Sequence, residues 1–447
     1  MSLSYSYHWI LFRIFSCRWK YKGAYDESFE KYNIEDGHFI LAKEADSSLI
    51  DKLEKENLSI GQLLYKDVDR KNNHTIRLYK NRTKVNKACL MDGNMPKADD
   101  EIAIDRLYGE NNNIAIGDKI DIGNKDYKVT GYIALSDYSA LFKNNTDMMF
   151  DANKFSVAIV TDKAFDDVET EAKYCYTWNY TNDLEKNMSD KQLTKKSEKI
   201  QDILTESGLL TDYVLQRDNQ AINFTGEDMG GDMVMVMVLL YIVMAIIAFV
   251  FGITTRNTIE QEAGAIGTLR ASGYTKQEMV RHYFVLPALI TFIAAVIGNI
   301  LGYTVMKFYV ASMYYGSYSL PTYVTKWNAD AFILTTVIPC IIVFVVTLIV
   351  LNVSLRISPL QFLRHDLKKN KKSKVVKLPN FKFKTRFRLR IIFQNTSTYI
   401  TLFLGILFAS VLLMFGMMMS PLLTNFKDRV LDSKIANYQY ILKAPMK

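Results

Sequence analysis

Cysteine and proline are scarce in this sequence of 447 residues, which has only four cysteines and eight prolines. The cysteines stand at positions 17, 89, 175 and 340, without the paired spacings that are typical of zinc and other metal sites. We therefore predict neither a metal site nor a bound cofactor. A disulfide between Cys89 and Cys175 stays open, because the sequence does not give the distance between them.

The sequence also lacks a glycine-rich loop that ends in Lys-Ser or Lys-Thr. Such a loop binds the phosphates of ATP through its backbone N–H groups and its lysine. Without it the chain is not expected to hydrolyse ATP, and we predict that it is not an enzyme. Any energy taken from ATP has to come from a separate partner.

Long stretches without charge are abundant, by contrast. The ranges 233–255, 283–306 and 331–355 contain 23, 24 and 25 residues without Asp, Glu, Lys or Arg. A fourth uncharged run goes from 391 to 426, with its most apolar part near 398–420. About 20 helical residues cross a bilayer core of roughly 30 Å, so we predict an α-helical membrane protein with four transmembrane helices at these places.

The positive charge of the sequence, +8 in all, is concentrated after the third apolar run. Thirteen Lys or Arg residues lie between Arg356 and Arg390, against one acidic residue. Because cytoplasmic loops of membrane proteins carry an excess of Lys and Arg, we interpret residues 366–397 as a cytoplasmic linker and not as a nucleic-acid site. Counting the spans back from this linker places residues 256–282 inside the cell and residues 1–228 outside.

The polar residues 21–228 show the mixed pattern of an N-terminal α/β domain, here expected to be extracytoplasmic. Alternating apolar residues predict a strand over 75–79. Short strands over 120–122 and 127–129 are joined by Gly123 and one further residue, which predicts a tight hairpin.

An external domain needs an export signal or a membrane span ahead of it. Residues 1–20 provide neither, because Arg13, Cys17 and Arg18 interrupt their apolar residues. We therefore expect residues 1–20 to be an atypical N-terminus and the true first helix to be missing. Residues 421–447 are expected to begin a second extracytoplasmic region that is truncated.

The segment between the first two predicted spans has the form of a short amphipathic helix. A stripe of residues recurs at spacings of three and four, formed by Ile259, Ala263, Ile266 and Leu269 or Arg270, which predicts one apolar stripe on a helix over 256–272. Gly273 suits the left-handed conformation past a helix C-terminus, and Thr275 with Glu278 forms a capping box that starts the next helix. Such a helix would lie near the cytoplasmic surface, where another protein could push on it.

This segment resembles a known family. Seven of its residues look like the E..IG.LRA.G signature of the FtsX-like permease family: Glu262, Ile266, Gly267, Leu269, Arg270, Ala271 and Gly273. The sequence PLQFLR at 359–364 is similar to the usual ending of that family, and residues 88–135 resemble the MacB-like extracytoplasmic domain of such permeases. The resemblance covers roughly residues 88–135 and 232–365.

The resemblance implies a permease subunit of an ABC transporter. A separate ATPase on the cytoplasmic side would drive export of, or mechanical work on, lipid, peptide or cell-envelope substrates. Membrane lipids and a dimeric arrangement of permease blocks are the other implied partners. The implied ATPase-coupling residues are Glu262, Ile266, Gly267, Leu269, Arg270 and Gly273, with Glu262 and Arg270 as candidate polar contacts. The implied domains are an extracytoplasmic domain at 21–228, a three-helix block at 229–365, a linker at 366–397 and the first span of a second block at 398–420.

Other classes fit the sequence less well. A secondary transporter is disfavoured because the first three spans contain no ionisable residue. The alternative is a sensory receptor whose external domain signals through its helices. The sequence names neither the substrate nor the direction of transport.

Small residues mark one face of the second predicted span. Ala294, Gly298 and Gly302 recur at intervals of four, a pattern that lets two membrane helices approach closely. We predict a tight helix crossing on this face.

Overall fold

The computed structural model describes residues 25–70, 73–123, 125–181, 189–207, 209–322, 329–364, 382–394 and 396–432. The chain divides into two compact units. One is formed by Met1–Tyr241 with Leu289–Ile341, and the other by Ile242–Ala288 with Ile342–Lys447. The first unit holds the predicted α/β domain, and the second holds the segment that resembles the permease signature.

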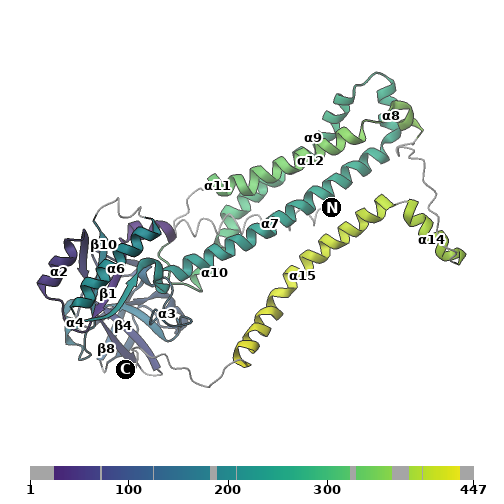
Figure 1. Ribbon diagram of the computed structural model, residues 1–447. Coiled ribbons are helices and arrows are strands. Elements are labelled where there is room, and N and C mark those ends of the chain that lie inside the picture. The colour runs from purple at the N-terminus through teal and green to yellow at the C-terminus, as the bar shows by residue number, and fades with distance from the viewer. Residues whose placement is uncertain are drawn as a thin grey trace. The chain divides into compact units, whose positions relative to one another are not determined.

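The first sheet of the α/β domain is antiparallel and has four strands among the described residues. In spatial order they are β11 (Leu210–Leu215), β1 (Gly37–Leu41), β10 (Tyr174–Tyr180) and β2 (Leu58–Gln62). Helices α2 (Ser47–Glu54) and α6 (Asp190–Glu206) pack on it (Figure 1). Phe39 and Trp178 from the strands are fully buried with Leu53 and Ile200 from the helices, and each such side chain contributes roughly 1.5–3 kcal/mol.

The second sheet is mixed, with seven strands in the part of the chain that the structure describes. Its strands follow the order β3 (Tyr65–Arg70), β4 (His74–Tyr79), β9 (Phe155–Ile159), β6 (Glu101–Asp105), β8 (Lys125–Leu135) and β5 (Ala88–Gly93), with β7 (Lys119–Ile122) paired to β8. The pairs β4 with β9 and β6 with β8 are parallel. Helices α3 (Arg106–Asn111) and α4 (Asp162–Asp167) follow β6 and β9 along the chain.

Local predictions in this sheet are confirmed. The predicted strand over 75–79 lies in β4, which is buried at every one of these positions. Its polar members keep their hydrogen bonds, because Thr75 donates to Asp69 and Arg77 donates to Asp67. The predicted hairpin forms between β7 and β8. Gly123 has φ +57° at this turn, a left-handed conformation that glycine adopts without a steric cost.

Three helical segments are long and apolar enough to cross a membrane among the described residues, as predicted. The first is α7 (Gln220–Gln261). The second consists of α9 (Lys276–Leu301), one π-helical turn (Gly302–Met306) and α10 (Lys307–Tyr315). The third consists of the π-helical turn Ile333–Val337, which follows α11 (Ala329–Phe332), and α12 (Ile338–Ser354).

The remaining helices are α8 (Ala263–Ala271), α13 (Pro359–Leu363), α14 (Phe383–Gln394) and α15 (Thr396–Asp432). The fourth predicted span falls in α15, where the apolar stretch Leu402–Met418 is shorter than the other three, so this span stays a prediction. Residues 421–432 still belong to α15. The predicted segment 1–20, most of the linker at 366–397 and the end of the chain lie outside the described residues.

The disulfide that the sequence left open is not formed. Cys89 and Cys175 are both free thiols. They belong to different hydrophobic clusters, because Cys89 packs with Ile34 and Ala134, whereas Cys175 packs in the core of the second sheet.

Candidate coupling site

The segment between the first two long helices begins with a break at Glu262. Helix α7 ends at Gln261 and α8 begins at Ala263. Glu262 lies between them with φ −93° and ψ 13°, outside the helical region. The expected amphipathic helix over 256–272 is therefore the end of α7 followed by the separate helix α8.

Helix α8 ends and α9 begins as the sequence predicts. Gly273 has φ +104°, and the following Tyr274 N–H donates to the Leu269 carbonyl at 3.2 Å, a bond typical of a helix end with a left-handed residue. Two residues later the capping box forms. The Thr275 N–H donates to Glu278 Oε2 at 2.7 Å, and the Glu278 N–H donates to Thr275 Oγ1 at 3.3 Å.

The inner face of α8 is buried in one cluster of the second unit. Ile259, Ala263 and Ile266 follow the predicted apolar stripe and are at most 2% exposed. They pack with residues from α9, from the end of α12 and the residue after it, and from α13: Met279, Leu351, Leu355 and Phe362. Figure 1 shows α8 beside the ends of α9 and α12.

Two motifs that lie almost one hundred residues apart meet in this cluster. A Cβ atom added at Gly267 of α8 would lie 2.9 Å from the backbone nitrogen of Leu363 in α13. Only glycine permits this close approach, because real Cβ atoms do not come so near to a backbone atom. The IG.LRA signature and the PLQFLR motif therefore form one packed unit. Helix α13 begins with a capping box of Ser358 and Gln361 and has Pro359 at its start.

The charged signature residues Glu262 and Arg270 have partners within this chain. The Tyr283 hydroxyl of α9 donates to Glu262 Oε2 at 2.5 Å. Arg270 Nη1 donates to the carbonyl of Ile357 at 2.6 Å and to that of Leu355 at 3.2 Å. No sequence pattern indicates these contacts, and both residues were expected to be candidate contacts to an ATPase.

The outward face of α8 is exposed and uncharged. It consists of Ala265, Thr268, Leu269 and Ser272, with Tyr274 just beyond the helix. Leu269 is 39% exposed and Tyr274 is 51% exposed. Of the two residues at which the predicted stripe could end, Arg270 contacts the chain after α12, whereas Leu269 is exposed.

The small residues of the second span lie on a buried face, with one difference from the prediction. Gly298 and Gly302 are buried, and Thr291 and Ala295 share their side, while Ala294 is only half-buried. Next to this face, Asn299 Nδ2 donates to Thr336 Oγ1 of the third span at 3.2 Å and to the Ala295 carbonyl at 2.9 Å.

A polar joint in the first unit, which the sequence did not reveal, fixes the chain after α10 to the second sheet. Arg106 Nη2 donates to the carbonyls of Tyr315 at 2.7 Å and Tyr318 at 3.1 Å. The Ser319 hydroxyl donates to Asp105 Oδ2. Asp105 also caps α3 by accepting from two N–H groups of its first turn, so this carboxyl serves the sheet and the helix end together.

The same joint includes the beginning of α7. The Tyr318 hydroxyl donates to Asp228 Oδ2 at 2.8 Å, and the Tyr314 hydroxyl donates to Asp232 Oδ2 at 3.2 Å. Asp228 and Asp232 are four residues apart in α7, which places both acids on one face of this helix. Met229, between the two acids, is buried with Val310 in the apolar cluster beside them. The α/β domain is thereby attached to two of the long helices.

Residues 237–359 match the family described as FtsX-like permease C-terminal. Among solved structures, the crystal structure of the extracellular domain of noncanonic ABC-type transporter YknZ from Gram-positive bacteria is similar at 12% sequence identity. That match covers 40% of this chain and 98% of that chain, with a TM-score of 0.23. No curated protein matches the chain.

The three long apolar helices and this family match define a multi-pass membrane protein of the permease class. Residues 237–359 are similar to the FtsX-like permease C-terminal family, and this match supports a transporter permease component.

Proposed function

We propose that this chain is the permease subunit of an ABC transporter and that a separate ATPase on the cytoplasmic side binds the outward face of α8. The observation that carries the proposal is the division of α8 into two faces. Ile266 and Gly267 hold its inner side against the ends of the spans, and Leu269 with Tyr274 leaves an exposed uncharged side. An exposed apolar patch on a rigid element is typical of a protein contact.

The family signature divides accordingly into two roles. Ile266, Gly267 and Gly273 shape the helix and its end. Leu269 is the signature residue that we assign to the ATPase contact, together with Tyr274. The ATPase would then push on a helix that cannot move without moving the spans.

The α/β domain is proposed to lie outside the cell. The thirteen basic residues between Arg356 and Arg390 support this orientation, because they favour a cytoplasmic position after the third span. Single cysteines on a cysteine-free background test it in intact cells. Met148→Cys, at a position 89% exposed in the α/β domain, should react with an impermeant maleimide, and Ser272→Cys should not. External labelling at Ser272 would reverse the orientation.

The proposed work is the transmission of motion to the outside, on lipid, peptide or cell-envelope substrates. The first three predicted spans have no ionisable residue, which argues against an ion path. The joint around Asp105 and Arg106 ties the α/β domain to the chain after α10, so movement of that helix reaches the sheet directly. A dimeric arrangement of permease blocks would provide two such domains.

Docking is tested with a candidate ABC-type ATPase. The two proteins are co-expressed, and the retained ATPase and its activity are measured after purification of the permease. Leu269→Glu and Tyr274→Glu should each lower retention at least tenfold, since a charge would be placed in an apolar contact. Met148→Glu, at a residue of the α/β domain that is 89% exposed, introduces the same charge away from α8 as a control and should retain the ATPase. Full retention by Leu269→Glu would remove α8 as the docking surface.

A further inference from the structure

Helix α8 is held at both of its ends by the two charged residues of the signature. We infer that Glu262 and Arg270 are positioning residues that fasten α8 to the second and third long helices, so that a displacement of α8 moves both helices together. This inference deepens the proposed function, on which its consequence for transport rests. The fastening itself concerns only contacts within this chain.

Arg270 fastens the C-terminal end of α8 to the third helix. Leu355 directly follows α12, and Ile357 precedes the capping box of α13. The last carbonyl groups of a helix have no partner within the helix, and a cation near them also interacts favourably with the helix dipole. Arg270 provides a hydrogen-bond donor and a positive charge at this helix end, because its Nη1 donates to the carbonyls of Leu355 and Ile357. The guanidinium thus links α8 to the turn between α12 and α13.

Glu262 fastens the N-terminal end of α8 to the second helix. It lies at the break between α7 and α8, where its carboxylate accepts a hydrogen bond of 2.5 Å from the Tyr283 hydroxyl. Tyr283 belongs to α9 and is also part of the apolar cluster under α8. A hydrogen bond to an ionised carboxylate is shorter and stronger than one between neutral groups. This contact therefore fixes the beginning of α8 on α9.

The two fastenings are eight residues apart, which corresponds to about 12 Å along a helix. Between them, Gly267 lies in close contact with Leu363 of α13. A helix that is held at both ends and in the middle can neither rotate nor tilt independently of its supports. These contacts are made by side chains other than the exposed Leu269 and Tyr274, so positioning and docking are separable by mutation.

The fastening is tested on the full chain in detergent, without an ATPase, by hydrogen exchange of α8 and of residues 355–362. Arg270→Gln should raise exchange in both segments about tenfold, because hydrogen bonds to a charged group are lost. Arg270→Lys should have a smaller effect, since its ammonium still donates as a point charge. Tyr283→Phe, which removes only the hydroxyl, should raise exchange at the start of α8. Met148→Ala, at an exposed position of the α/β domain, is the control and should leave exchange in both segments unchanged.

The outcomes separate this inference from the proposed function. Wild-type exchange in Arg270→Gln and Tyr283→Phe would overturn the fastening, whatever the ATPase does. With the ATPase present, Arg270→Gln should still retain it but should lose the dependence of transport on ATP hydrolysis. Loss of ATPase retention together with normal exchange would also contradict the inference, because it would make Arg270 a docking residue. Failure of the wild-type chain to bind any ATPase would remove the proposed function and leave the exchange result standing.

Discussion

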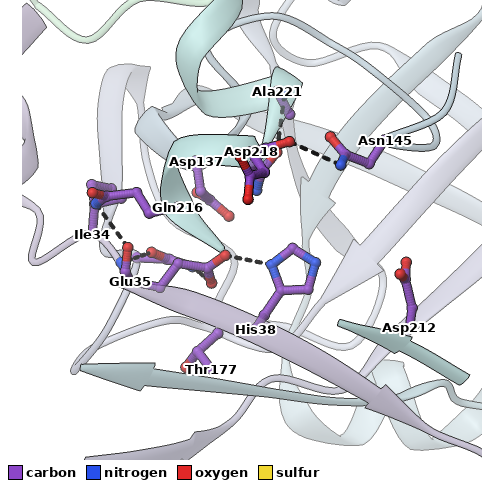
Figure 2. Close-up of polar contacts among 12 residues, drawn as sticks. Ile34, Glu35, His38, Asp137, Asn145, Thr177, Asp212, Gln216, Asp218 and Ala221 are labelled. Carbon is purple, nitrogen blue, oxygen red and sulfur yellow. Dashed lines mark hydrogen bonds and ion pairs between the residues drawn. The ribbon is translucent and has the colours of Figure 1, made fainter. Parts of the chain in front are cut away.

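His38 Nδ1 lies 2.5 Å from Glu35 Oε1 in the α/β domain, and the Glu35 side chain is only 3% exposed while that of His38 is 19% exposed (Figure 2). Hydrogen bonds join Glu35 to residues beside both sheets of the domain. Asn86, which precedes β5 of the second sheet, donates to Glu35 Oε2 at 2.7 Å, and Gln216, which follows β11 of the first sheet, donates to the Glu35 carbonyl at 2.8 Å. The pair is therefore placed where the two sheets and the approach to α7 meet.

The charges around this pair favour its ionised form. Burial alone would raise the pKa of Glu35, but the charge of His38 and hydrogen bonds from His38 and Asn86 hold this pKa below its ordinary value. Burial alone would lower the pKa of His38, but Glu35, with Asp212 and Asp137 nearby, raises it above its ordinary value of 6.5. Arg82 also faces Glu35 and is paired with Asp137 at 2.6 Å.

We predict a loss of stability at alkaline pH that depends on His38. Because the pKa of His38 is raised on folding, its contribution is complete below pH 6.5 and is lost as the pH rises through the higher pKa of the folded state. His38→Gln should destabilise the domain by about 3 kcal/mol at pH 6, since the buried Glu35 loses the cationic partner that is hydrogen-bonded to it. The unfolding temperature of the full chain is measured from pH 6 to 9. Equal pH dependence of wild type and His38→Gln would contradict the prediction.

Asp105 should produce a second pH dependence, at lower pH. Burial raises its pKa from 3.8 to about 6, although Ser319, the α3 N–H groups and Arg106 favour the ionised form. The folded state therefore prefers the protonated acid, and its contribution is present below pH 3.8 and lost as the pH rises through about 6. The difference corresponds to about 3 kcal/mol.

Asp105→Asn separates this effect from other titrating groups. Asparagine keeps the cap of α3 but does not titrate, so the variant should lose less stability than the wild type between pH 4 and pH 7. The measurement is the difference between the two unfolding temperatures at each pH. A difference that does not change with pH would show that Asp105 does not titrate on folding.

Local signals in the sequence predicted local structure well. The positive φ of Gly273, the capping box of Thr275 with Glu278 and the hairpin at Gly123 each depend on residues within four positions. The exposure of Leu269 was not predictable in this way, because the inner face of α8 is selected by α13, which lies far along the chain.

Contacts between distant residues were beyond the sequence for the same physical reason. Asp105 and Ser319 are 214 positions apart, and no periodicity relates a strand end in one domain to a loop after a membrane helix. Arg270 looked like a surface charge because its partners are backbone carbonyls, which have no signature in a sequence. The buried face contains Ala295 instead of the predicted Ala294. The sequence does not distinguish these two neighbouring alanines, because only packing against another helix does so.

Two glycines outside any close contact should respond to alanine in opposite ways. A Cβ at Gly273 or at Gly230 would meet nothing within 4 Å. Gly273 has φ +104°, so Gly273→Ala should destabilise the end of α8 by about 1–2 kcal/mol. Gly230 is inside α7, so Gly230→Ala should stabilise that helix by up to about 1 kcal/mol. Hydrogen exchange of α8 and of the start of α7 measures both effects, and a protective effect of Gly273→Ala on α8 would contradict the backbone argument.

The buried face of α9 gives the last prediction. Gly298 is buried beside Asn299, which bonds to Thr336 of the third helix, so a large side chain at Gly298 has to displace a packed neighbour. Gly298→Leu should destabilise the helix packing by about 1–3 kcal/mol, the usual cost of overpacking, and Ala294→Leu should cost less because Ala294 is half-buried. Thr304→Leu, at an exposed position of the same long helix, introduces an identical side chain and should be close to neutral. Thermal unfolding in detergent and resistance to proteolysis in membranes rank the three variants. Equal loss of stability in Gly298→Leu and Thr304→Leu would mean that this face of α9 does not pack closely.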